Sequence, residues 1–64
     1  MQIDLLLKRL AKPAQRALQN AGITTLDELA RYREEEIAAL HGIGKNALSI
    51  IKSTLQENRL ALAE

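Results

Sequence analysis

The segment best suited to chemistry is Gly42-Ile43-Gly44-Lys45, in which two of the protein's three glycines stand directly before a lysine. An amphipathic pattern begins at Lys45, so the free backbone N–H groups and the positive dipole of a helix start are expected there. Glycines leave these groups uncovered and the lysine adds positive charge, which together favour a bound anion. We favour a phosphate of a nucleic-acid backbone, because a loop without side chains can approach it closely. The same glycines are also consistent with a tight turn that binds nothing.

The other residues of catalytic or metal-binding type do not form a set. His41 is the only histidine, cysteine is absent, and no serine or carboxylate can be assigned to His41 by spacing. The glutamates at positions 34–36 are interpreted as the solvated start of a helix, with a protein interface as the alternative. We therefore expect a non-enzymatic protein that uses neither a metal ion nor another cofactor.

Basic residues supply the charge for a phosphate contact, although the net charge of the whole protein is only +1. If about two to four phosphates are neutralised, the slope of log affinity against log salt is about −2 to −4, which means weak binding by one copy. Asn46 and Arg16 have side chains that can read base edges if they reach a groove. The predicted DNA-binding residues are Gly42, Ile43, Gly44, Lys45, Asn46, Lys52, Arg16 and Lys12.

The composition predicts an all-α fold. Leu, Ile and Ala supply most of the 47% apolar residues, Tyr32 is the only aromatic residue and valine is absent, which favours helices over strands. A protein of 64 residues can bury only a small core, so we expect one domain, 1–64. That domain is predicted to be a compact bundle of four to five short helices.

Capping residues place the helices in the first half of the sequence. Pro13 suits the first turn of a helix and Gly22 can adopt the left-handed conformation that ends one, which predicts a helix over 13–21. Thr25 and Glu28 have the spacing of a capping box, so a short helix begins directly after Thr25.

The second half of the sequence predicts a helical hairpin. A short helix follows the glutamate run, Gly42 and Gly44 provide the tight turn, and Ile43 is directed toward the core. Residues 45–58 form an amphipathic helix, for which Asn58 is the expected left-handed stop.

The segment 1–11 permits two interpretations, because its leucines form either a short helix or an arm that covers the core. It lacks the basic region, the sustained apolar run and the cleavage site of a signal peptide. No apolar run in the sequence is long enough to span a bilayer. We therefore expect a cytoplasmic protein without a membrane partner.

The stretch IAALHGIGKNALSII resembles the helix-hairpin-helix motif, whose apolar and glycine positions are filled by Ile37, Leu40, Gly42, Ile43 and Gly44. Over residues 13–63 the sequence is similar to the C-terminal domain of the bacterial RNA polymerase α subunit and to small stand-alone bacterial proteins related to it. The resemblance implies a bundle of four or five helices that acts in transcription. It also implies contact with the DNA backbone through the hairpin and the start of the first helix, largely from the minor-groove side.

Individual positions agree with that family only in part. Gly44 matches its hairpin glycine, and Lys45 matches a basic position after it. The family's arginine and asparagine at the first helix correspond to Pro13 and Arg16. Its second lysine, its serine and an acidic position of the last helix correspond to Asn46, Ala47 and Ile50. These differences argue against promoter-element recognition of the polymerase type, whereas the fold is unaffected.

The sequence thus predicts a small non-enzymatic protein that binds double-stranded DNA weakly through backbone contacts, with little sequence specificity. The alternative is a protein-interaction module of the same fold that docks on a transcription or repair complex. For this alternative, Ile50 at the edge of the core stripe would contact another protein or a second copy, together with exposed leucines among residues 5–7. Ile50 is otherwise an extension of the core.

Overall fold

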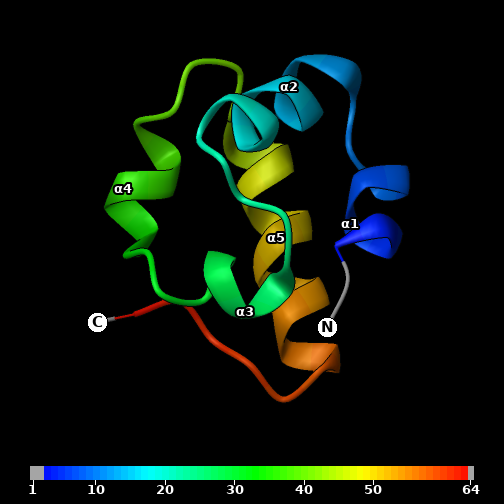
Figure 1. The fold of residues 1–64 in the computed structure, drawn as a ribbon, viewed down its shortest axis with the longest axis vertical. Helices are drawn as coiled ribbons and strands as arrows, with labels where there is room; N and C mark the ends of the chain where they lie inside the picture. Colours follow the sequence, from blue (N-terminus) through cyan, green and yellow to red (C-terminus); the bar gives the residue numbers. More distant parts are fainter. Residues whose placement is uncertain (1–2, 64) are drawn as a thin grey trace.

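A computed structural model describes residues 3–63, which form five α-helices and no β-strand. The described part of the protein measures 25 × 23 × 21 Å along its principal axes. The helices are α1 (Asp4–Arg9), α2 (Lys12–Asn20), α3 (Leu26–Leu29), α4 (Glu34–Ala38) and α5 (Lys45–Glu57). The predicted all-α bundle of four to five short helices is therefore confirmed (Figure 1).

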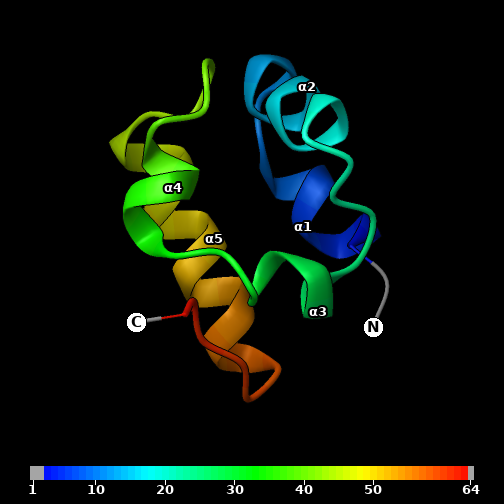
Figure 2. The same cartoon turned by 60° about the vertical axis from the view of Figure 1, so that its left-hand side comes forward.

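Helix α5, the longest helix, runs along the back of the bundle in the view of Figure 1, and the shorter helices lie in front of it and to its sides (Figures 1 and 2). Its buried face carries Ile51, Thr54 and Leu55, all without solvent exposure. Apolar side chains from every other helix pack into the same core, and the buried ones on those helices and their connections are Ile3, Leu6, Leu10, Ala14, Leu18, Ile23, Leu26, Leu29 and Ile37. Burial of these side chains is the main favourable contribution to folding, since the described residues contain no metal cluster or disulfide.

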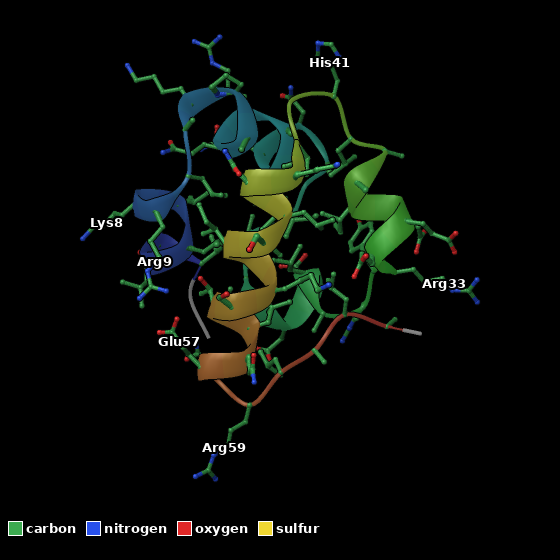
Figure 3. The ribbon with its side chains drawn as sticks, turned by 180° about the vertical axis from the view of Figure 1, so that it is seen from behind. Lys8, Arg9, Arg33, His41, Glu57 and Arg59 are labelled. Carbon is green, nitrogen blue, oxygen red and sulfur yellow. The ribbon has the colours of Figure 1, made fainter. Side chains whose placement is uncertain are left out.

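Helix α1 decides between the two interpretations of the N-terminal segment in favour of a short helix. Leu6 is completely buried, with Ile3 and Leu10 nearly so at either end of the helix. The guanidinium of Arg9 donates two hydrogen bonds to the Glu57 carboxylate, at 2.7 and 3.2 Å (Figure 3). These hydrogen bonds lower the pKa of Glu57 and raise that of Arg9, so the pair joins α1 to the end of α5 in its charged form. Residues 1 and 2 of the segment lie outside the described part.

Helix α2 begins and ends one residue before the predicted bounds, and Gly22 ends it in the way that the sequence predicts. Gly22 has φ +78° and follows the helix in the left-handed conformation. The Ile23 N–H donates to the Leu18 carbonyl at 3.0 Å and the Gly22 N–H to the Gln19 carbonyl at 3.0 Å, which is the Schellman pattern.

Helices α3 and α4 are each about one turn long and are stabilised by hydrogen bonds at their N-termini. The Thr25 hydroxyl accepts a hydrogen bond from the Glu28 N–H at 3.1 Å, which is one of the two bonds of the predicted capping box. The Glu28 carboxylate accepts from the Thr24 hydroxyl at 2.6 Å, and this bond lowers the pKa of Glu28. At α4 the Arg33 N–H donates to the Glu36 carboxylate at 2.9 Å, so one of the three glutamates also caps its own helix.

The predicted left-handed stop at Asn58 is wrong. Asn58 has φ −103°, and the left-handed residue is Arg59, with φ +60°. The Leu60 N–H donates to the Leu55 carbonyl at 2.8 Å, which completes a second Schellman motif one residue later than expected. The physical reason lies in the Asn58 side chain, whose amide donates to the Thr54 carbonyl at 2.8 Å from an ordinary negative φ.

After α5 the backbone turns back along the bundle and reaches the connection between α3 and α4 (Figure 1). There the Ala63 N–H donates to the Tyr32 carbonyl at 2.8 Å. Leu60 and Leu62 are half-buried against the core. Among the described residues, no helix has both the length and the apolar character needed to cross a membrane.

Candidate nucleic-acid interface

The turn between α4 and α5 has the tight form that the sequence predicts. The Ile43 N–H donates to the Leu40 carbonyl at 3.1 Å, and the half-buried Ile43 side chain packs against the core. Gly42 has φ +102°, a value that side chains oppose. One glycine of the pair therefore provides the backbone freedom that the reversal needs.

Gly42 has a second role, because it lies directly against the start of α2. A Cβ atom at this position would stand 2.5 Å from the carbonyl oxygen of Pro13, far inside van der Waals contact. Only a glycine allows the two backbones to approach this closely. The turn and α2 consequently lie together at one end of the molecule (Figure 2).

Gly44 differs from Gly42, and the expectation that both glycines serve the turn is only half correct. Its φ of −103° and ψ of −173° are open to any residue. Apart from Gly44 and its two neighbours in the chain, no described residue has an atom within 4 Å of a Cβ built at this position. Neither the turn nor the packing requires a glycine here.

The N-terminus of α5 presents unpaired backbone donors. Gly44 is the N-cap and has no side chain with which to cap the helix. The first hydrogen bond of the helix runs from the Leu48 N–H to the Gly44 carbonyl at 2.9 Å. Within residues 3–63, the N–H groups of Lys45, Asn46 and Ala47 have no hydrogen-bond acceptor. The unpaired backbone N–H groups predicted at the start of α5 therefore lie beside the exposed side chain of Lys45.

The contact between the turn and α2 brings the other predicted basic residues to the hairpin. A surface hollow of about 460 Å³ is lined by Lys12, Pro13, Arg16, Ala17, Asn20, His41 and Gly42. His41 is exposed at the tip of the turn (Figure 3). Sequence reasoning did not place His41 and Asn20 in this group, because spacing in the sequence gives no sign of a contact between α2 and the turn.

Lys52 lies further along α5 and is not a free cation. Its Nζ is 2.8 Å from the Glu34 carboxylate of α4. In contrast, Lys12, Arg16 and Lys45 make no ion pair with any described residue. Three of the four predicted cations are thus available to a ligand as the protein stands.

The surface expected for the protein-interaction alternative is smaller than predicted. Leu6 is fully buried and Leu7 is half-buried, because α1 turns this face toward the core. Only Leu5, 51% exposed, is a large apolar side chain on the surface of the described residues. Ile50 is half-buried and packs against the core, which agrees with both interpretations of this residue.

Residues 7–57 match the family of the C-terminal domain of the bacterial RNA polymerase α subunit, and this range includes the hairpin and the basic end of α2. The protein belongs to this family. The α C-terminal domains of the family are non-catalytic and bind DNA and proteins in transcription. Searches among curated proteins and among solved structures gave no significant match. The first turn of α1 and the tail after α5 lie outside the matched range of this α C-terminal domain.

Proposed function

We propose that this protein binds double-stranded DNA through the phosphate backbone, with little sequence specificity and without catalysing a reaction. The observation that carries the proposal is the glycine at position 44. Neither its dihedral angles nor its neighbours among the described residues require a glycine. The missing side chain at the N-cap supports the proposal because it lets a ligand approach the backbone of α5 closely.

The chemistry around Gly44 selects an anion as that ligand. Serine, aspartate or asparagine would cap α5 better than glycine, but each would occupy the free N–H groups that follow. With glycine, the donors of Lys45, Asn46 and Ala47 stay open, and the helix dipole favours negative charge at this point. The thirteen residues of α5 make this the strongest helix dipole of the bundle.

A polyanion suits the surface better than a single small anion. Lys12 and Arg16 flank the turn on the α2 side and Lys45 on the α5 side, so free cations stand on both sides of Gly42. If each of these three contacts one phosphate, the slope of log affinity against log salt is about −2.7. Affinity from so few contacts is modest and falls strongly with salt.

Duplex DNA is favoured over a single strand. Proteins that bind single strands without sequence preference stack bases on aromatic side chains. The only aromatic residue is Tyr32, in the connection between α3 and α4 at the opposite end of α5 from the hairpin (Figure 1). A protein that contacts only the backbone and stacks no bases depends on the positions of the phosphates, which are regularly spaced in a duplex.

The proposal is tested by titrating isotope-labelled protein with a short duplex at low salt and following the backbone amide signals. We expect shifts at Gly42, Gly44 and Lys45 that disappear when salt is added. Lys45→Gln should weaken binding and make the salt slope less negative by about 0.9, with stability changed by less than about 0.5 kcal/mol.

Arg59→Gln is the matched control, since it removes the same charge at the far end of α5 (Figure 3). It should leave the duplex affinity nearly unchanged. If the amide signals do not move up to millimolar duplex, the proposal fails and the protein-interaction alternative takes its place. Equal losses for Lys45→Gln and Arg59→Gln would mean that net charge, and not the hairpin, determines binding.

A further inference from the structure

Lys52 lines two separate hollows of the surface. On one side, a hollow of about 370 Å³ runs down α5 from the hairpin and is lined by Lys45, Leu48, Ser49, Lys52, Ser53 and Gln56. On the other side, a more apolar hollow is lined by Glu34, Lys52, Leu55, Gln56 and the tail residues 60–63. The ammonium of Lys52 can serve either side, because a lysine side chain is long and flexible.

In the structure this ammonium is turned toward the second hollow, where it pairs with Glu34 at 2.8 Å. Both side chains are about half exposed, at 55% and 53%. An exposed pair of this kind gains little free energy, so another anion can displace the carboxylate. The first hollow meanwhile has two hydroxyl groups, of Ser49 and Ser53, about one and two helical turns along α5 from Lys45.

We propose that Glu34 competes with DNA phosphate for Lys52 and so limits the interface to the hairpin end of α5. When Glu34 releases Lys52, the first hollow becomes a second phosphate position, in which Lys45 and Lys52 supply charge and the serine hydroxyls donate hydrogen bonds. Glu34 is therefore a residue that sets the affinity without touching the DNA. This inference rests on the proposed function, because it concerns the same DNA surface.

A matched pair of substitutions in α4 tests this competition. Glu34→Gln and Glu35→Gln each remove one negative charge from the first turn of α4. The Glu35 carboxylate lies 3.9 Å from the Arg33 guanidinium and does not pair with Lys52. Only Glu34→Gln therefore releases the lysine. We expect Glu34→Gln to raise duplex affinity at low salt about 1.5- to 5-fold above that of Glu35→Gln. The salt slope should become more negative by about 0.9 only for Glu34→Gln, because one more phosphate is neutralised.

A third substitution separates release of Lys52 from a general change of charge. Lys52→Gln should cost more affinity in the Glu34→Gln protein than in the native protein, and the double variant should bind like Lys52→Gln alone. Equal gains for Glu34→Gln and Glu35→Gln, or strictly additive effects of Glu34→Gln and Lys52→Gln, overturn the competition while leaving DNA binding at the hairpin intact. If the native protein and Glu34→Gln both fail to bind duplex, the proposed function falls, and this inference falls with it.

Discussion

The two glycines of the hairpin have different physical roles, and replacing each with alanine separates them. At Gly42, an alanine must adopt φ near +102°, and its Cβ would stand 2.5 Å from the Pro13 carbonyl oxygen. Left-handed backbone costs an L-residue roughly 1–2 kcal/mol, and the turn must also move away from α2. We expect Gly42→Ala to lower the free energy of unfolding by at least about 2 kcal/mol. That is a large part of the roughly 3–10 kcal/mol available to 64 residues.

Gly44→Ala is the matched comparison, because its backbone is compatible with alanine and its Cβ would have no described atom within 4 Å outside its two chain neighbours. The weaker N-cap is offset by the smaller entropy of the unfolded state, so stability should change by less than about 0.5 kcal/mol. The new methyl group stands beside the free donors of α5 and should weaken duplex binding.

Thermal unfolding followed by circular dichroism measures the difference between the two variants. The midpoint should fall by about 8–16 °C for Gly42→Ala and by at most a few degrees for Gly44→Ala. Two outcomes would refute the reasoning. Equal midpoints would show that the contact with Pro13 does not hold the turn. Unchanged duplex affinity of Gly44→Ala would remove the observation on which the proposed function depends.

Two further predictions concern the last residue of α5 and the two residues that follow it. Arg59→Gly should raise the free energy of unfolding by about 0.5–1 kcal/mol, since glycine adopts φ +60° without strain. Asn58→Gly should lower the free energy of unfolding, because it removes the hydrogen bond to the Thr54 carbonyl. Denaturation in urea measures both changes, and the opposite order would contradict the Schellman assignment. Arg9 lowers the pKa of Glu57 from its ordinary 4.5, so the stability from this pair is present above about pH 4.5 and is lost as the pH falls through the folded-state value. Glu57→Gln should therefore lose less stability between pH 6 and pH 3 than the native protein does, and an equal loss would show that the pair does not contribute.

The helices could be predicted because their signals are local. Pro13 and Gly22 bracket α2, and the Thr25 hydroxyl caps α3 three residues upstream of its partner. The second Schellman motif was misplaced because Arg59 carries no local signal for a left-handed conformation, while Asn58 does. Sequence patterns identify the residue type that a conformation favours, and here the pattern failed because the Asn58 side chain binds the Thr54 carbonyl and leaves the left-handed position to Arg59.

The candidate interface was only partly predictable, since its decisive contacts join distant positions. The approach of Gly42 to Pro13 spans the first and second halves of the sequence, and no periodicity records it. The pairing of Lys52 with Glu34 likewise depends on how α4 packs against α5. The sequence therefore overestimated the number of unpaired basic side chains at the interface, because Lys52 is paired. It also did not predict that the exposed residues His41 and Asn20 belong to the interface beside the turn.

The contact between Gly42 and Pro13 lies between the two basic residues of α2, Lys12 and Arg16. Proline fixes φ near −65°, which suits the first turn of α2, and its carbonyl faces Gly42. At this position the resemblance to the α C-terminal domain places the family's arginine, whose charge is absent here. Lys12 and Arg16 on either side restore positive charge along the same turn of α2. The protein thus holds the hairpin against α2 by backbone contact and carries positive charge on neighbouring positions, an arrangement that suits the proposed contact with the phosphate backbone.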